Sequence, residues 1–213
     1  HDSGLAMAMA AKAAGLKEIC FTDHIDHDCD AEGRSMVFDP KVYSAEYDNL
    51  EVPGLKIRRG MEFGLKPYNQ AQLKQDLQRR HFDFVLGSIH FVDDLDVYFE
   101  PFWNGKTVLE AEQRYLEETL NCVRLHDDFD VLGHLTYISK AWNNPAHRRI
   151  AYGDYRDLTD EILRTLVKKG KGIEGSIFRL QTEKEKEDNG NQDLQGQCIP
   201  WQKCGKARGA GAS

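Results

Sequence analysis

The chain has 213 residues, of which 40% are hydrophobic and 30% charged, and its formal net charge is -7 at pH 7. This composition is typical of a soluble globular protein with one core, and the acidic balance argues against a protein that coats nucleic acid, although a local basic pocket could still bind a small phosphate. No apolar run approaches the roughly 20 residues that span a bilayer, so neither nucleic acid nor a membrane is an expected partner.

The cysteines and the first residues indicate the compartment. The five cysteines are scattered and odd in number, so they form neither a disulfide framework nor a C-x-x-C pair. Residues 5–14 are apolar but lack the basic stretch of a secretory signal. We therefore predict a cytoplasmic protein.

Helices and strands are expected to alternate along the chain, beginning with a helix. Ser3 can cap this helix and Gly15 can end it, and Asp39-Pro40 can open the next one. The patterns predict helices over 3–14, 39–50, 69–80, 107–126 and 157–169, and strands over 19–22, 55–61, 82–86, 129–132 and from residue 172. Residues 23–38 are predicted as a polar loop and 91–105 as an aromatic one.

This alternation predicts an α/β fold with a parallel sheet and right-handed crossovers. A TIM-like barrel is favoured over an open sheet because each strand ends in a histidine or a glutamate, and strand ends converge at the mouth of a barrel. These residues are His24, Glu62, His90, His134 and Glu174. No glycine-rich phosphate loop of the nucleotide-binding α/β folds is present.

The last part of the chain differs in character. Residues 181–213 are polar and rich in Gly and Gln, without an apolar period, so they are expected to be a disordered or aberrant tail after a domain over 1–180. Because a barrel needs more strands than these, we expect a chain truncated at both ends.

The residues at the strand ends are suited to a divalent metal. Imidazole is a ligand for zinc, iron and manganese, and a carboxylate can bridge two ions. Two nearby ions can hold a phosphoryl oxygen and activate a water. For each histidine alone, a structural place in a turn is the more common explanation, but all three at successive strand ends favour a metal site.

Four segments carry a resemblance to a known family. T-D-H at 22–24, G-M-E-F-G at 60–64, G-S-I-H-F-V at 87–92 and D-V-L-G-H-L at 130–135 resemble successive motifs of the polymerase-and-histidinol-phosphatase (PHP) superfamily. The segment G-S-I-H-F-V-D-D with its aromatic loop is most similar to the histidinol-phosphatase branch.

The resemblance implies a distorted (β/α)7 barrel, incomplete here, with a cluster of two or three Zn, Mn or Fe ions. It implies hydrolysis of L-histidinol phosphate to L-histidinol and phosphate, in histidine biosynthesis. The metal ligands that it implies are His24, Glu62, His90 and His134, with Glu62 as the bridge. Asp23 would lie behind the ligands and orient the T-D-H loop, unless it is an ordinary loop aspartate.

Substrate phosphate needs a cation, and a bidentate guanidinium suits a phosphate dianion. The resemblance places Arg179 in the substrate-binding position, and Lys140 is the weaker candidate; each is otherwise a solvated surface cation. The H-x-H and D-x-H motifs of the superfamily have no match in the sequence, so no proton-transfer residue is assigned.

Two other readings remain open at this point. One is a PHP phosphoesterase that acts on a different ester, such as a nucleotide or a sugar phosphate. The other is a catalytically incomplete fragment that binds metal only in part, which the two unmatched motifs favour.

Overall fold

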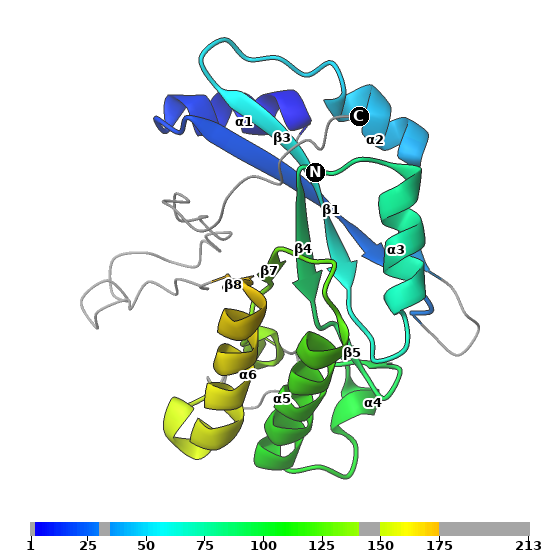
Figure 1. The fold of residues 1–213 in the computed structure, drawn as a ribbon, viewed down its shortest axis with the longest axis vertical. Helices are drawn as coiled ribbons and strands as arrows, with labels where there is room; N and C mark the ends of the chain where they lie inside the picture. Colours follow the sequence, from blue (N-terminus) through cyan, green and yellow to red (C-terminus); the bar gives the residue numbers. More distant parts are fainter. Residues whose placement is uncertain (1–2, 30–34, 141–149, 175–213) are drawn as a thin grey trace.

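The structure is a computed structural model that describes residues 3–29, 35–140 and 150–174. Its main feature is a six-stranded sheet with the strand order β2-β1-β3-β4-β7-β8 (Figure 1). Five of these strands are parallel: β1 (Glu18–Asp26), β3 (Lys56–Gly64), β4 (Phe84–Ser88), β7 (Val131–Leu132) and β8 (Gly172–Ile173). The edge strand β2 (Met36–Val37) pairs antiparallel with the end of β1.

The other elements connect and cover these strands. The helices are α1 (Gly4–Ala13), α2 (Pro40–Tyr47), α3 (Gln70–Arg79), α4 (Glu100–Trp103), α5 (Val108–Leu125) and α6 (Arg156–Lys169). The remaining elements are two short 3-10 helices, η1 (Tyr137–Lys140) and η2 (Tyr152–Asp154), and a hairpin of β5 (Phe91–Val92) and β6 (Leu95–Asp96). In the part of the chain that the structure describes, no helix is both long and apolar enough to cross a membrane.

The predicted α/β class and parallel sheet are confirmed. Helices α2, α3, α5 and α6 each lie in the connection between two parallel strands that pair or neighbour in the sheet. Over residues 3–29, 35–140 and 150–174 the sheet is open, with β2 at one edge and β8 at the other, so these residues alone do not close the expected barrel. Figure 1 shows α5 and α6 side by side below the parallel strands.

Local chemistry fixes the helix ends close to the predicted positions. Ser3 accepts a hydrogen bond from the backbone N–H of Ala6 at 3.2 Å and so caps α1. Thr107 and Glu110 form a capping box at the start of α5. At the end of α6, Gly170 takes the left-handed conformation, with φ of 66°.

The expectation that a polar loop begins at residue 23 is wrong, because β1 continues to Asp26. Residues 18–25 of β1 pair in register with residues 56–63 of β3, and Ile25 and Asp26 also pair with β2. The buried polar residue of this extension, Asp26, contacts His24 and His90, so its burial costs little. The strand β3 likewise runs beyond the predicted limit to Gly64.

The aromatic loop predicted over 91–105 contains regular structure. Asp93 and Asp94 both have positive φ, at 52° and 61°, which is the backbone of the tight turn that joins β5 and β6. Trp103 of α4 is buried and donates a hydrogen bond from Nε1 to the carbonyl of Val97 at 2.9 Å. Trp103 therefore serves packing.

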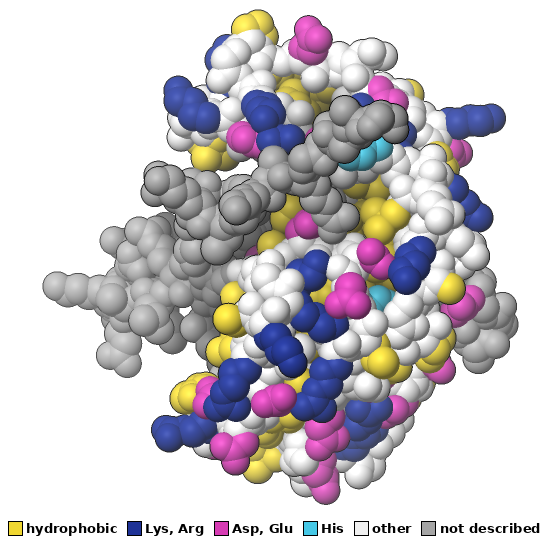
Figure 2. All heavy atoms as spheres, in the orientation of Figure 1, with side chains coloured by type: hydrophobic (Ala, Val, Ile, Leu, Met, Phe, Trp, Pro, Cys, Tyr) yellow, Lys and Arg dark blue, Asp and Glu magenta, His cyan; other side chains and the backbone are white. Residues whose placement is uncertain are grey.

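The outer surface over α5 and α6 carries charges of both signs. Figure 2 shows Lys and Arg side chains intermingled with Asp and Glu side chains on this face. Two of the pairs are Arg124 with Glu161 at 3.0 Å and Arg164 with Asp160 at 3.2 Å. Exposed pairs of this kind contribute little to stability but keep the surface solvated.

Candidate metal centre

The four predicted ligands lie together at the carboxyl ends of four adjacent strands. His24 of β1 is directly opposite Glu62 of β3 in the pairing of these strands. His90 and His134 each follow their strands, β4 and β7, by two residues. Residues that are up to 110 positions apart in the sequence therefore converge because their strands are parallel neighbours.

Three of these side chains form a compact triangle of ligand atoms. His134 Nε2 lies 3.0 Å from Glu62 Oε1, and His90 Nε2 lies 3.2 Å from the same oxygen. The two Nε2 atoms are 3.3 Å apart. A tetrahedral zinc ion with bonds of about 2.0 to 2.1 Å has ligands about 3.3 Å apart, so these three residues fit one face of a zinc coordination shell.

His24 lies on the other side of Glu62. Its Nε2 is 3.7 Å from Oε2 of Glu62, the oxygen that the other two histidines do not contact. The His24 side chain is 55% exposed, whereas His90 and Glu62 are buried. The two carboxylate oxygens of Glu62 thus face different histidines, an arrangement that suits a carboxylate shared by two ions.

Asp26 is a further residue of the centre that sequence reasoning missed. Its side chain is 1% exposed, and its two oxygens contact Nδ1 of His90 at 2.8 Å and Nδ1 of His24 at 3.2 Å. The strand period offered a signal, because residues two apart in a strand point to the same face. The prediction that the strand ended at residue 22 concealed this signal.

Asp23 faces away from this cluster. It lies with Tyr43, Glu46 and Tyr47 around a hollow between β1 and α2. Burial raises the pKa of Asp23 above its usual value, against a side-chain hydrogen bond with Tyr47 that lowers it. In the structure, Asp26 rather than Asp23 contacts the predicted ligands His24 and His90.

The charges of the cluster are strongly coupled. Burial raises the pKa of Glu62, but hydrogen bonds with His134 and His90 outweigh it and hold this pKa far below its usual value. Burial lowers the pKa of His90, whereas hydrogen bonds to Asp26 and Glu62 raise it to about 10. The centre therefore holds anionic carboxylates next to imidazole rings. A metal cation can replace the protons on these rings and neutralise the carboxylates.

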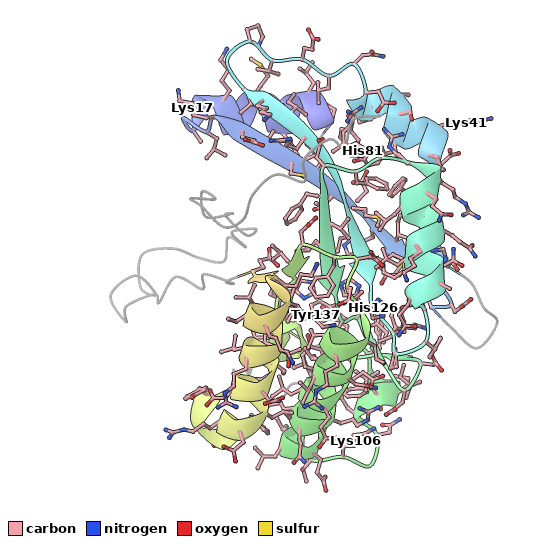
Figure 3. The ribbon with its side chains drawn as sticks, in the orientation of Figure 1. Lys17, Lys41, His81, Lys106, His126 and Tyr137 are labelled. Carbon is pink, nitrogen blue, oxygen red and sulfur yellow. The ribbon has the colours of Figure 1, made fainter. Side chains whose placement is uncertain are left out.

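Other residues fix the position of His134. The ring of Tyr137 in η1 stacks on the ring of His134, with centroids 4.7 Å apart, and meets the ring of His90 edge-on at 5.3 Å. The backbone N–H of His134 donates to Glu174 at 2.9 Å, so the fifth strand-end residue also reaches the centre. In Figure 3, Tyr137 lies in the middle of the molecule, whereas His81 lies close to α2, far from it.

The structure leaves the roles of the two predicted phosphate-binding cations untested. Lys140 is exposed at the end of η1. Arg179 and the tail over 181–213 lie outside the described residues. Their roles stay predictions.

Comparison with known proteins identifies relatives of the chain. A probable histidinol-phosphatase of Clostridium acetobutylicum is 32% identical over 183 residues, which are 84% of this chain and 69% of the relative. The histidinol-phosphatase of Lactococcus lactis subsp. lactis is 31% identical over 168 residues, 77% of this chain and 61% of the relative. The chain thus spans about two thirds of the length of these proteins.

Solved structures agree with the fold. A crystal structure of the histidinol phosphate phosphatase of Lactococcus lactis subsp. lactis, complexed with Zn, L-histidinol and phosphate, matches with a TM-score of 0.68 at 30% identity; the match covers 78% of this chain and 64% of that one. A putative histidinol phosphatase from Listeria monocytogenes matches with a TM-score of 0.66 at 15% identity, over 81% of this chain and 75% of that one, and supports the fold alone. The PHP domain matches residues 3–176. The chain therefore belongs to the PHP domain family.

Proposed function

We propose that this chain is a metal-dependent phosphate monoester hydrolase that converts L-histidinol phosphate to L-histidinol and phosphate in histidine biosynthesis, in the cytoplasm. The observation that carries the proposal is the triangle of Glu62, His90 and His134, whose ligand atoms are 3.0 to 3.3 Å apart. The relatives named histidinol-phosphatase, and the similar enzyme complexed with Zn, L-histidinol and phosphate, support the substrate.

The ligands divide into two groups around Glu62. Glu62 Oε1, His90 and His134 would hold one ion, and Glu62 Oε2 and His24 would contribute to a second. Zn, Mn and Fe are the candidates, as two or three ions, because imidazole and carboxylate suit all three. Bound ions would polarise the phosphoryl oxygens and supply a nucleophilic water at neutral pH.

The chain's own residues have supporting tasks in this reaction. Tyr137 covers the rings of His134 and His90 and so limits the access of water to them. Lys140 and Arg179 remain the proposed contacts of the substrate phosphate, by the charge of their side chains. The general acid and base stay unassigned.

The test is phosphate release from L-histidinol phosphate by the purified chain, supplied with zinc or manganese. We expect turnover that a chelator abolishes, and a preference for this ester over a nucleotide and a sugar phosphate. A clear preference for another ester would contradict the proposed substrate. Zinc binding without hydrolysis of any ester would indicate a catalytically incomplete metal-binding chain instead.

The ligand assignment has its own variant and control. His134→Ala should lower zinc affinity by at least 100-fold, since the loss of a ligand exceeds the roughly 10- to 100-fold effect of removing a residue behind it. His81→Ala removes an exposed histidine far from the centre and should bind zinc like the parent. Equal zinc affinity in the two variants would contradict the assignment.

A further inference from the structure

The buried carboxylate of Asp26 contacts two histidines of the centre, in each case at the Nδ1 atom of the ring. Asp26 Oδ1 lies 2.8 Å from Nδ1 of His90, and Asp26 Oδ2 lies 3.2 Å from Nδ1 of His24. The two imidazole rings are 5.1 Å apart and tilted by 40°. Each oxygen of the carboxylate thus has its own histidine.

This contact decides which nitrogen of each ring is free. An ionised carboxylate only accepts hydrogen bonds, so each Nδ1 must carry the proton that it donates. When a metal ion replaces the proton on Nε2, the ring is neutral and its lone pair lies on Nε2. His90 Nε2 lies 3.2 Å from one oxygen of Glu62, and His24 Nε2 lies 3.7 Å from the other. Both Nε2 atoms therefore face the carboxylate that would be shared by two ions, and Nδ1 is the atom held by Asp26.

The chain makes room for this carboxylate. Gly64 of β3 lies beside it, and a β-carbon at this position would come within 2.0 Å of Asp26 Oδ1. Asp26 is also almost completely buried, so water does not compete for its oxygens. A residue that touches the cluster only through the outer nitrogens of its histidines is placed to orient them.

We propose that Asp26 is a positioning residue that holds His24 and His90 at once, with Nδ1 protonated and Nε2 presented to metal, and so links the two ion positions on either side of Glu62. The inference rests on the metal-binding role given to these histidines under the proposed function. It adds that both ion positions depend on Asp26, so a change at Asp26 should weaken metal binding at both.

A matched variant pair tests this role. In Asp26→Asn the side-chain amide has one accepting oxygen and one donating nitrogen, so it can support only one histidine in the required form. The control is Asp76→Asn. Asp76 is a buried carboxylate outside the centre, and it contacts Nε2, rather than Nδ1, of His27 at 2.7 Å. Each variant keeps the size of the side chain and removes one buried charge.

The first readout is zinc affinity, measured by competition with a chromophoric chelator. Asp26→Asn should bind zinc about 10- to 100-fold more weakly than the parent, which is the usual effect of removing a partner of a metal-bound histidine. Asp76→Asn should bind zinc like the parent. Parental zinc affinity in Asp26→Asn would overturn the proposal.

The second readout is the protonated nitrogen of each histidine, from two-dimensional NMR of 15N-labelled, zinc-loaded protein. In the parent, His24 and His90 should carry the proton on Nδ1, while His27 should carry it on Nε2 and serves as an internal reference. This measurement needs no variant, so it decides the matter even if Asp26→Asn does not fold. A proton on Nε2 of His24 or His90 in the parent would overturn the proposal.

The spectrum of Asp26→Asn separates positioning from direct ligation. We expect at least one of the two histidines to move its proton to Nε2. Loss of one zinc equivalent with both protons still on Nδ1 would identify Asp26 as a ligand and overturn the proposed role. Neither readout uses phosphate release, so a parent that binds zinc in this form without hydrolysing an ester contradicts the proposed function alone.

Discussion

Gly64 and Asp26 are in such close contact that a side chain at position 64 fits only if the Asp26 carboxylate moves. A β-carbon on Gly64 would lie 2.0 Å from Oδ1 and 3.0 Å from Cγ of Asp26. The φ angle of Gly64 lies outside the left-handed region, so only this close approach, and not the backbone, requires glycine. The second glycine of the G-M-E-F-G segment is thereby explained by the residue that it faces.

Gly64→Ala should therefore displace the carboxylate and weaken zinc binding. We expect a loss of zinc affinity of about 10- to 100-fold, as for other changes behind metal ligands, and a loss of about 1 to 3 kcal/mol in the free energy of unfolding from overpacking. Chelator competition and urea unfolding measure the two effects. Gly153→Ala is the control, because a β-carbon there meets nothing within 4 Å. Similar zinc affinity in both variants would contradict this account.

Zinc binding near neutral pH should release protons from the centre. Although burial lowers the pKa of His90, its hydrogen bonds to Asp26 and Glu62 raise this pKa to about 10 in the metal-free protein. The ring is then charged at pH 7.5, and a ligand nitrogen must lose its proton before it can bind metal. We expect release of at least one proton per protein molecule.

Calorimetric titrations with zinc in two buffers of different ionisation enthalpy measure this release. The observed heat per mole of protein should differ between the two buffers by at least the difference between their ionisation enthalpies. His81→Ala should show the same change, since its altered residue lies far from the centre. A heat that does not depend on the buffer would contradict the charged state of His90.

A different histidine, His126, should make the stability of the protein depend on pH. It is 1% exposed at the end of α5, and its Nε2 donates a hydrogen bond to the carbonyl of Lys66 at 2.8 Å. Burial lowers its pKa below the usual 6.5. Below about pH 6.5 the unfolded chain therefore takes up a proton that the folded protein does not, and the free energy of unfolding falls as the pH falls.

The variant His126→Gln keeps a donor for Lys66 but does not titrate. Denaturant unfolding of metal-free protein at pH 7.5, 6.5 and 5.5 should give a steeper loss of stability for the parent than for the variant, by up to about 1.4 kcal/mol per pH unit. Chelator in every sample keeps metal binding out of the comparison. Parallel curves for the two proteins would show that folding does not lower the pKa of His126.

The sequence was sufficient to predict where the centre lies because one physical rule governs it. His24, Glu62, His90 and His134 each stand at the carboxyl end of a predicted strand, and parallel strands bring these ends to one edge of a sheet. The structure brings the four side chains within hydrogen-bonding or ion-pair distance of one another in a connected set. Their placement needed only the order of helices and strands.

The sequence was not sufficient to predict the extension of β1, where other side chains, rather than water, are the partners of polar groups. Asp23, His24 and Asp26 are hydrophilic and therefore favoured a loop, yet they lie in β1 because β2 and β3 pair with this segment. A local pattern cannot report such partners, since Glu62 and His90 are far away in the sequence. The strand period would have separated Asp23 from His24 and Asp26, had the strand been extended.

Tyr137 was missed for a related reason. It lies in a short 3-10 helix after β7, a segment without apolar periodicity, and its contact with His134 depends on a turn of three residues. The hairpin of β5 and β6 was also hidden, because each of its strands has only two residues. Short elements of this kind have little sequence signal of their own.

The four predicted ligands lie at the ends of four strands, and this has a consequence for folding. An ion bound to Glu62, His90 and His134 would connect β3 to the ends of β4 and β7, which are separated by long stretches of chain in the unfolded state. The unfolded chain cannot offer the same arrangement, so tight metal binding adds to the free energy of unfolding by mass action. The ion would act as a cross-link between strands, and the folded sheet would then be more stable where more metal is available.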